Sequence, residues 1–445
     1  MLSGIDALLY RYGSDYPIHH YLPNRPLHPL LFLLMSLFLS ATEANAQIGH
    51  VTHVHDPCII MSGDYWYIFS TGDRVAIRRS SDLYRWAFTG SIFKDIPSWG
   101  LQEVPGVSNI WAPDVFYHNK TYYIFYSLST FGSNRSRIGL VTNVTLDQTD
   151  PNYEWVDRGK VIESNASDNF NAIDPNIVKD KGGRIWMSLG SFWSGIKLIE
   201  LDTTSLKVKA GARLTSIASR GGDAIEAPFI IWKNGYYYLF VSFDACCQGI
   251  ESTYRIMVGR AQEITGPYFD RSERSMLSGG GSRVLSGGER WHGTGHCAIL
   301  SEGDRDWLVY HAYDADNNGI PALRISLLNW DADGWPVVDE SNPVNVEDLN
   351  SRPVAFRLGQ NYPNPFNPQT TIRFQVPEIS HVRIKVFNMI GQEVVTLADA
   401  VYEPGIYRLQ WNGEDRLGQP VSSGTYFYQL QRDGQIETKR LLLLR

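Results

Sequence analysis

Cysteine and unbalanced charge are both scarce in this sequence of 445 residues. Four cysteines cannot form a disulfide scaffold in a chain of this length, and their spacing is not that of a metal site. The 40 basic and 47 acidic residues leave a net charge of −7, which gives no general attraction to nucleic acid or anionic membranes. Charged residues make up only 20%, too few for a disordered chain. A folded protein with a neutral or cationic partner is expected.

Apolar runs of membrane-spanning length, ~20 residues, are also missing. The apolar stretch from Pro29 to Ser40 is shorter and is followed by Ala44-Asn45-Ala46, which is typical of a secretory signal with its cleavage site. We predict a signal peptide over residues 1–46, cleaved after Ala46, with a membrane anchor as the weaker interpretation. Residues 1–28 are long and polar for such a signal, which leaves the true translation start open. The mature chain is expected to have no transmembrane anchor.

Cys246 and Cys247 are direct neighbours in the sequence. Their Cα atoms must lie ~3.8 Å apart, below the ~4.4–6.8 Å usual for a disulfide. The favoured interpretation is two small buried hydrophobic side chains. The alternative is a vicinal disulfide that lines a pocket, which secretion would permit.

Aromatic residues are abundant at 13%, and they recur in a repeat. Five segments share one pattern: a polar residue beside small residues or Pro, an apolar strand, a turn, and an aromatic-rich strand that ends near Ser, Thr or His. A repeat of roughly 50 to 70 residues without helical periodicity is typical of propeller blades. We predict a five-bladed β-propeller over residues 47–338, with an ordinary β-sandwich as the alternative. The polar residues that open the segments are Asp56, Asp114, Asp174, Glu226 and His296.

The first strands of propeller blades line a central channel, so these five polar residues are expected to meet at one mouth. Carboxyl groups gathered in a partly desolvated pocket are typical of the active site of a glycosidase. One carboxylic acid protonates the leaving oxygen and one carboxylate activates water or attacks. A third carboxylate would keep the acid protonated near neutral pH. Any one of them could instead cap a strand, and only the repeated placement favours catalysis.

The remainder of the chain changes character after Pro336. Residues 339–355 are polar and irregular and are predicted to be a linker, whereas residues 356–445 alternate like strands separated by Asn-Gly and other Gly turns. We predict a small Ig-like β-sandwich here. Its motifs resemble the type A sorting domain of type IX secretion, which implies export by that machinery, with release or cell-surface attachment. An accessory carbohydrate-binding sandwich is the alternative. The motifs are Tyr362–Pro368, Gly391, Gly405–Tyr407, Gly424–Tyr426 and Leu441–Leu444.

Residues 50–338 resemble glycoside hydrolase family 43, and within it the endo-1,5-α-L-arabinanases. The resemblance implies a five-bladed propeller that hydrolyses arabinan or a related plant cell-wall polysaccharide and inverts the anomeric centre, with acid and base ~6.5–9.5 Å apart. It makes Asp56 the general base, Glu226 the general acid, and Asp174 the residue that modulates the acid's pKa and orients substrate. The motifs that carry it are His53–Pro57, Asn109–Asp114, Tyr126–Gly132, Ala172–Asn176, Ile225–Pro228, Cys246–Gly249, Ser252–Ile256 and Gly293–His296.

His296 matches the family's histidine that faces a metal or water cluster in the channel. The resemblance implies one Ca²⁺ there, held by His296 and waters, although Ca²⁺ prefers six to eight oxygen ligands. Na⁺, water alone, or a histidine hydrogen-bonded to the acid or to backbone remain alternatives. No organic cofactor is expected.

Substrate contacts are expected from residues beside the axial motifs. Asp114 would bind a sugar hydroxyl or hold the Trp111–Pro113 turn, and Asn171 precedes the Asp174 motif. Trp111 and Phe131 are expected to stack on a furanose ring, ahead of Trp193 and Trp291.

Alternative functions fall into two classes, other activities of the same family and non-catalytic sugar binding. An exo-acting arabinanase, an arabinofuranosidase or a β-xylosidase would use the same family machinery. A non-catalytic sugar-binding propeller would not need an acid and a base at these positions. No motif or charge pattern supports a nucleic-acid or membrane function.

Overall fold

The computed structural model of the protein describes residues 47–445, except 73, 304, 339–355, 362 and 433. The predicted signal peptide (1–46) and linker (339–355) lie outside the described residues. The described part is built almost entirely of strands, which confirms the predicted all-β class. Its helical elements are short: α1 (Ser98–Glu103) and three 3₁₀ turns, η1 (Gly249–Glu251), η2 (Met276–Ser278) and η3 (Ala315–Asn317).

Five sheets, here called sheets 1 to 5, follow one another between residues 48 and 338. Sheet 1 comprises β1 (Ile48–Gly49), β2 (His55–Ser62), β3 (Tyr65–Thr71), β4 (Ala76–Ser80) and β5 (Arg85–Ser91). Sheet 2 comprises β6 (Trp111–His118), β7 (Thr121–Leu128), β8 (Ser136–Asn143) and β9 (Val156–Ser164). Sheet 3 comprises β10 (Asn176–Lys179), β11 (Ile185–Leu189), β12 (Ile196–Leu201) and β13 (Thr215–Ala218). Sheet 4 comprises β14 (Ile225–Lys233), β15 (Tyr236–Phe243), β16 (Arg255–Ala261) and β17 (Ser282–Ser286). Sheet 5 comprises β18 (Trp291–Glu302), β19 (Arg305–Asp314), β20 (Ile320–Trp330) and β21 (Pro336–Val338).

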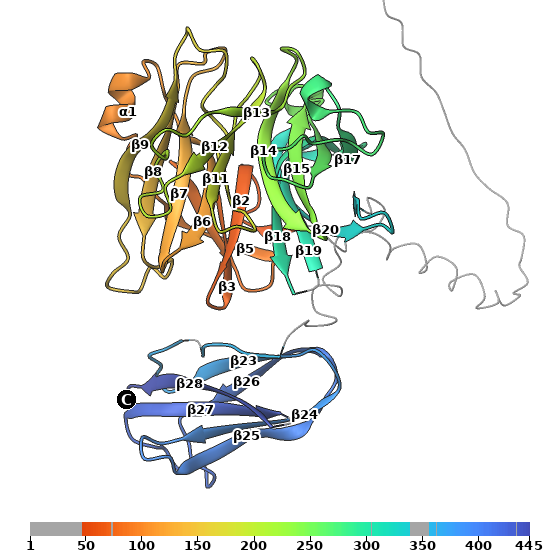
Figure 1. Cartoon of the computed structure of the whole chain (residues 1–445). Helices are drawn as coiled ribbons and strands as arrows, with labels where there is room; N and C mark the ends of the chain where they lie inside the picture. The colour runs from red at the N-terminus through yellow and green to blue at the C-terminus, as the bar shows by residue number, and fades with distance from the viewer. Residues whose placement is uncertain (1–46, 73, 304, 339–355, 362, 433) are drawn as a thin grey trace, which may run out of the picture. The chain divides into compact units, whose positions relative to one another are not determined.

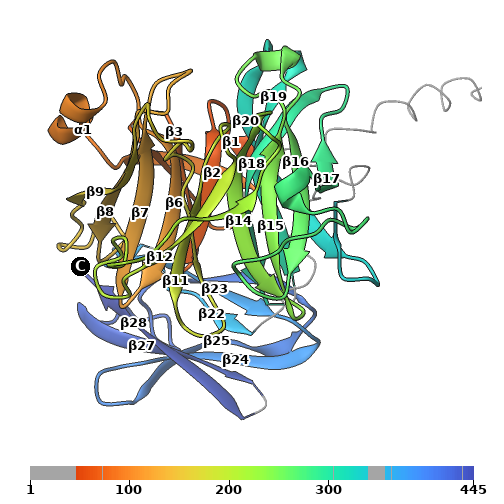
Figure 2. The ribbon, with the colours of Figure 1, turned by 45° about the horizontal axis from the view of Figure 1, so that its top comes forward.

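Consecutive strands pair antiparallel within each of these sheets, and β1 alone pairs in parallel, with β5. The first strands of successive sheets contact each other in a closed cycle that runs through β2, β6, β10, β14 and β18 and back to β2. Figure 1 and Figure 2 both show β2, β6 and β14 in the interior of this region and β9 and β17 at its edges.

Five hydrophobic clusters fill the spaces between neighbouring sheets. Each cluster draws on two consecutive sheets, and the last joins sheet 5 to sheet 1. Side chains alternate along a strand, so a strand buried on both faces must be apolar throughout. In β15, Tyr237 and Leu239 pack toward sheet 3 whereas Tyr238 and Phe240 pack toward sheet 5. The aromatic-rich runs therefore hold neighbouring sheets together.

Residues 357–443 form two further sheets. They share one hydrophobic cluster, which contains Ile372, Phe374, Ile384, Val386 and Tyr428, so the two sheets pack against each other. One sheet comprises β22 (Arg357–Leu358), β23 (Thr370–Val376) and β26 (Gly405–Trp411). The other comprises β25 (Glu393–Tyr402), β24 (Ser380–Phe387), β27 (Gly424–Arg432) and β28 (Gln435–Leu443).

None of the helices in the described residues combines the length and apolar character needed to cross a membrane.

Candidate active site

The inner strands of sheets 1 to 5 share an unusual backbone conformation near their first residues. One non-glycine residue in each strand, or just before it in sheet 3, has a left-handed φ: Asp56 (50°), Ala112 (44°), Asp174 (55°), Ala227 (54°) and His296 (48°). This conformation is costly for a residue with a Cβ, so the surroundings must hold it in place. In sheets 1, 2, 4 and 5 the ladder register also shifts at this point. Such irregularities turn side chains out of the regular alternation and toward a site.

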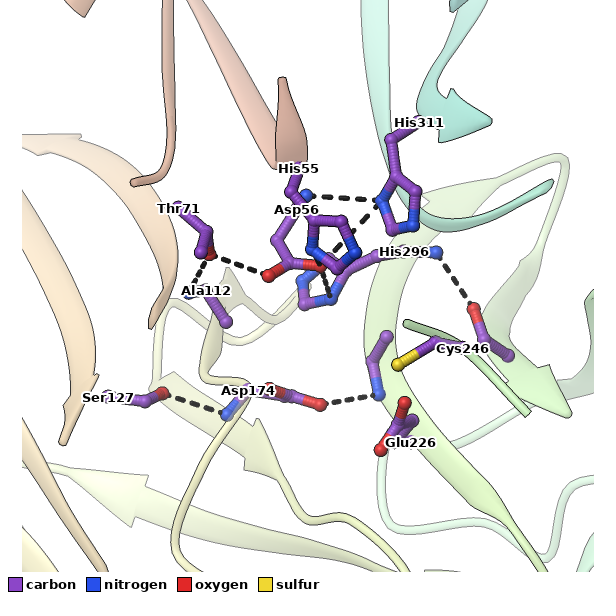
Figure 3. Close-up of polar contacts among 12 residues, drawn as sticks. His55, Asp56, Thr71, Ala112, Ser127, Asp174, Glu226, Cys246, His296 and His311 are labelled. Atoms are coloured by element: carbon purple, nitrogen blue, oxygen red, sulfur yellow. Dashed lines mark hydrogen bonds and ion pairs between the residues drawn. The ribbon is translucent and has the colours of Figure 1, made fainter. Parts of the chain in front are cut away.

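A ring of hydrogen bonds holds these five residues (Figure 3). Each donates its backbone N–H to a polar group of the preceding sheet, and four of the acceptors lie at or near the end of an aromatic strand. This arrangement explains why those strands finish near Ser, Thr or His. The pairs are Asp56 to His311 Nδ1 (3.1 Å), Ala112 to Thr71 Oγ1 (2.7 Å), Asp174 to Ser127 Oγ (3.0 Å), Ala227 to Asp174 Oδ2 (3.1 Å) and His296 to Ser242 Oγ (2.9 Å).

A cavity of about 590 Å³ opens at this ring. It brings together seven of the eight residues predicted for the site, which come from sheets 1 to 5 and the loops between their strands. Trp193 lines the cavity as well, whereas Trp291 stacks under Arg324, with the guanidinium carbon 4.2 Å from the ring centroid. The seven predicted residues that line the cavity are Asp56, Trp111, Phe131, Asn171, Asp174, Glu226 and His296.

Asp114 is the predicted residue that the structure does not bring to the cavity. Its Oδ2 atom accepts the backbone N–H of Ile177 (2.7 Å) and the side-chain amide of Asn176 (3.3 Å), so it ties β6 to β10. Burial raises the pKa of Asp114 to about 7. The ring position of sheet 2 is Ala112, and Asp114 lies two residues farther along the strand.

Asp56 is buried and surrounded by donors. Its Oδ2 accepts the Thr71 hydroxyl (2.6 Å), and its Oδ1 lies 2.8 Å from His55 Nδ1 and 3.1 Å from His296 Nδ1. Burial alone would raise the pKa of Asp56, but His55 and His296 bring this pKa well below its usual value. Asp56 is therefore ionised across the neutral range, as a general base must be.

Glu226 and Asp174 differ from Asp56 in the direction of their pKa shifts. Burial raises the pKa of Asp174 to about 8; the negative charge of Glu226 adds to the rise and His296 opposes it. Burial also raises the pKa of Glu226, against hydrogen bonds from Ser191 and Tyr254. The Ser191 hydroxyl donates to Glu226 Oε2 over 2.7 Å. At neutral pH this pair of carboxyls therefore retains a proton. A general acid needs such a proton to donate.

His296 lies among the three carboxyls. Burial would lower its pKa, but the carboxylates, Asp56 first, raise the pKa to about 9. The protonated imidazole pairs with Asp56 Oδ1.

Within the described part of the chain, His55, Asp56 and His311 form a group that could hold a metal ion, with their ligand atoms within 4.8 Å of one another. Two imidazoles and one carboxylate already bound by Thr71 make a poor set for Ca²⁺, which prefers oxygen ligands. The predicted calcium site, held by His296 and waters, stays a prediction, and no catalytic step proposed below passes through a metal.

Two predicted stacking residues form an aromatic wall of the cavity. The rings of Trp111 and Phe131 lie 5.0 Å apart between centroids, tilted by 46°. Phe131 is 80% exposed, so its face is open to a ligand. The separately predicted Asn171 is buried, and its Oδ1 accepts the Ser136 hydroxyl over 2.6 Å.

Several residues around the carboxyls were not predicted. His55 directly precedes Asp56 and Thr71 ends an aromatic strand, so both carried a sequence signal. Ser191 comes from a distant segment without a signal, whereas Tyr254 lies in the Ser252–Ile256 motif but was given no role. Tyr254 packs so closely on Gly295 that a Cβ there would lie 1.8 Å from the ring, which explains the glycine before His296.

The neighbouring cysteines form a disulfide, Cys246–Cys247, and both line the cavity. The favoured interpretation of two buried hydrophobic side chains was therefore wrong, and the vicinal bridge is confirmed. Cys58 and Cys297 are free and buried.

Comparison with known families decides the assignment. Residues 51–336 match the model of glycosyl hydrolases family 43. The chain belongs to this family. It is a glycoside hydrolase with the propeller fold of its relatives. Residues 360–443 match the model of a secretion system C-terminal sorting domain, which confirms the predicted resemblance.

Two curated relatives cover most of this family 43 chain. One is an extracellular endo-α-(1→5)-L-arabinanase of Bacillus subtilis, 46% identical over 309 residues, which are 67% of this chain and 93% of the relative. The other is an extracellular exo-α-(1→5)-L-arabinofuranosidase of Cellvibrio japonicus, 40% identical over 337 residues, 73% of this chain and 96% of the relative. The sorting domain and these extracellular relatives place the family 43 enzyme outside the cell or on its surface.

Solved structures agree with this assignment. An α-L-arabinanase of Cellvibrio cellulosa is 42% identical with a TM-score of 0.63, over 66% of this chain and 98% of that one. An arabinanase of Bacillus subtilis is 46% identical with a TM-score of 0.58, over 64% of this chain and 97% of that one.

Proposed function

We propose that this protein is an endo-1,5-α-L-arabinanase that hydrolyses internal bonds of arabinan with inversion at the anomeric carbon. The observation that carries the proposal is the opposite titration of two carboxyls in one cavity: the pKa of Asp56 is lowered and that of Glu226 is raised. A glycosidase needs this pair, one ionised and one protonated. A sugar-binding propeller does not require one ionised and one protonated carboxyl.

Asp56 is the general base in this mechanism. A carboxylate has about four lone-pair positions. His55 and His296 approach Oδ1 and Thr71 binds Oδ2, so one position on Oδ2 is free for a water. Asp56 takes a proton from this water as the water oxygen bonds to the anomeric carbon.

Glu226 is the general acid. It gives its proton to the glycosidic oxygen as the bond from that oxygen to the anomeric carbon breaks, so no charged alkoxide leaves. Asp174 modulates this acid by sharing the last proton of the coupled pair with Glu226, and it orients the substrate together with Asn171. Trp111 and Phe131 stack on arabinose rings.

We further propose that sheets 1 to 5 are the five blades of the propeller, with the catalytic domain at residues 47–338. The cycle of contacts among β2, β6, β10, β14 and β18 and the clusters between successive sheets support this count. Residues 356–445 form an Ig-like sandwich that serves export rather than catalysis, and 339–355 link the two domains.

Exo action is the second candidate, because a relative of 40% identity is an exo-acting arabinofuranosidase. Arabinofuranosidase or β-xylosidase activity would use the same carboxyls.

Digestion of linear α-1,5-arabinan by the purified protein tests the proposal. An endo enzyme produces a ladder of oligosaccharides early in the reaction, whereas an exo enzyme releases one short product from the start. Aryl arabinofuranoside and aryl xyloside substrates run in parallel identify the two glycosidase alternatives. No hydrolysis of any substrate would contradict the proposed function.

A further inference from the structure

A line of hydrogen bonds joins the vicinal disulfide to Asp56. The backbone N–H of Cys247 donates to Tyr313 Oη over 2.8 Å. Tyr313 Oη lies 2.7 Å from His55 Nε2, and His55 Nδ1 lies 2.8 Å from Asp56 Oδ1. The line runs from the loop between β15 and β16 through Tyr313 of sheet 5 to His55 of sheet 1 and ends at Asp56 Oδ1, and Figure 3 shows His55 and Asp56 beside His311 and His296.

One arrangement of protons satisfies every bond of this line. Burial raises the pKa of Tyr313, so its hydroxyl keeps its proton. The oxygen accepts from Cys247, and we assign its own proton to the bond with His55 Nε2. In this arrangement His55 donates from Nδ1 to Asp56 Oδ1. Stacking of His55 on His311, with ring centroids 3.8 Å apart, keeps the imidazole in this plane.

The disulfide constrains the first donor of this line. Bonding of Cys246 to Cys247 closes a small ring that includes the peptide unit between them, and the N–H that reaches Tyr313 belongs to that peptide unit. Cys247 also has a φ of 68°, which a residue with a side chain rarely adopts unless it is held. Other hydrogen bonds hold the rest of the turn: Gln248 N–H donates to Ser252 Oγ (3.0 Å) and Thr253 N–H donates to Ala245 O (2.9 Å).

We propose that the Cys246–Cys247 disulfide is a positioning element for the general base, acting through Tyr313 and His55. The inference rests on the proposed function of Asp56. With the disulfide broken, the Cys247 peptide turns away from Tyr313, the hydroxyl loses its fixed direction, and His55 no longer holds the Asp56 carboxylate toward the attacking water. The other hydrogen bonds keep the turn folded. Reduction should therefore lower kcat and leave substrate binding nearly unchanged.

Reduction of the native full-length protein is the experiment. Dithiothreitol supplies two electrons and two protons, the Cys246–Cys247 bond breaks into two thiols, and the reductant becomes its cyclic disulfide. Cys58 and Cys297 are already free thiols, so this bond is the reductant's target in the chain. Alkylation under native conditions confirms that the two thiols have formed. We expect kcat on linear arabinan to fall on the order of tenfold with KM changed less than about twofold.

Tyr313→Phe tests the path itself. This variant lacks the hydroxyl, so we expect it to be slow when oxidised and to lose no further activity on reduction. Tyr310→Phe is the matched control: Tyr310 is buried on the same strand, and its hydroxyl pairs with Ser326 instead. We expect that variant to keep the wild-type rate and the wild-type sensitivity to reductant. The double variant Cys246→Ser, Cys247→Ser should match the reduced wild type.

Three results would overturn the inference. They are an unchanged kcat after verified reduction, a rise in KM with kcat unchanged, and an equal further loss in reduced Tyr313→Phe. Each of these requires an oxidised enzyme that hydrolyses arabinan. An oxidised wild type without activity would instead contradict the proposed function.

Discussion

The carboxylate of Asp174 accepts the backbone N–H of Ala227, the residue that follows Glu226, over 3.1 Å. This bond fixes one carboxyl beside the backbone of the other. The pKa of each is raised, that of Asp174 to about 8, with burial as the leading cause for both. The two carboxyls therefore act as a pair, and the pair carries the proton that catalysis needs.

Asp174→Asn is expected to move one limb of the pH profile. Asn keeps the shape and a hydrogen-bond acceptor for Ala227 but cannot share the pair's proton. The native pair keeps its last proton up to a pKa of about 8. In the variant Glu226 alone holds the proton and loses it at lower pH, so the alkaline limb of kcat/KM on linear arabinan shifts toward acid. The acidic limb, set by Asp56 with its lowered pKa, should move much less. A fall in rate with both limbs unmoved would show that Asp174 only orients substrate or caps its strand.

Thr71→Val should lower both turnover and stability. The Thr71 hydroxyl donates to Asp56 Oδ2 and accepts the buried N–H of Ala112, so its loss leaves both groups short of a partner. We expect kcat to fall by ~10-fold and the free energy of unfolding by about 1–3 kcal/mol. Urea denaturation and steady-state kinetics measure the two effects. Thr71→Ser retains the hydroxyl and should stay near wild type; equal losses in both variants would rule out this role.

Phe131→Ala should weaken binding of the polysaccharide without slowing the chemical step. The ring is 80% exposed, so its removal costs little stability, whereas a stacked sugar loses about 1 kcal/mol of contact. We expect KM on arabinan to rise by ~5-fold with kcat within about twofold of wild type. Tyr117→Ala removes an aromatic residue that pairs with Tyr122 and does not line the cavity, and it serves as the control. An unchanged KM for Phe131→Ala would remove this residue from the substrate site.

Removal of residues 356–445 should separate export from catalysis. The purified truncated protein is expected to keep the kcat and KM of the full chain, because the predicted site residues precede residue 297. In the producing bacterium it should fail to reach the medium or the cell surface, as fractionation and immunoblotting would show. A folded but inactive truncation would instead assign the sandwich to the substrate site.

The repeat made three carboxyls of the cavity predictable from the sequence. Asp56, Asp174 and Glu226 stand at the starts of inner strands, and residues at equivalent places in a repeat converge on the axis. Asp114 has the same motif, but it lies two residues beyond Ala112, the ring residue of its sheet. Asp114 is also closer to Tyr123 in its following strand than Asp56 is to Tyr67, and this shorter spacing was visible in the sequence.

Residues that act across sheets could not be predicted in this way. Ser191 reaches Glu226 and Tyr313 reaches His55 over long sequence separations, and neither has a motif of its own. The disulfide was misjudged because the short Cα separation of neighbours argues against a bridge in general. Its place in an exposed turn beside the cavity could be seen only in the folded chain.

The leaving-group dependence of Glu226→Gln tests the central claim most directly. The rate is measured on linear arabinan, whose alkoxide must be protonated, and on a 2,4-dinitrophenyl arabino-oligosaccharide, whose phenolate leaves without a proton. If Glu226 is the general acid, the variant loses at least ~10²-fold on arabinan but remains within about tenfold of wild type on the activated substrate, whereas Asp56→Asn is slow on both. An equal loss on both substrates for Glu226→Gln would contradict the assignment of acid and base.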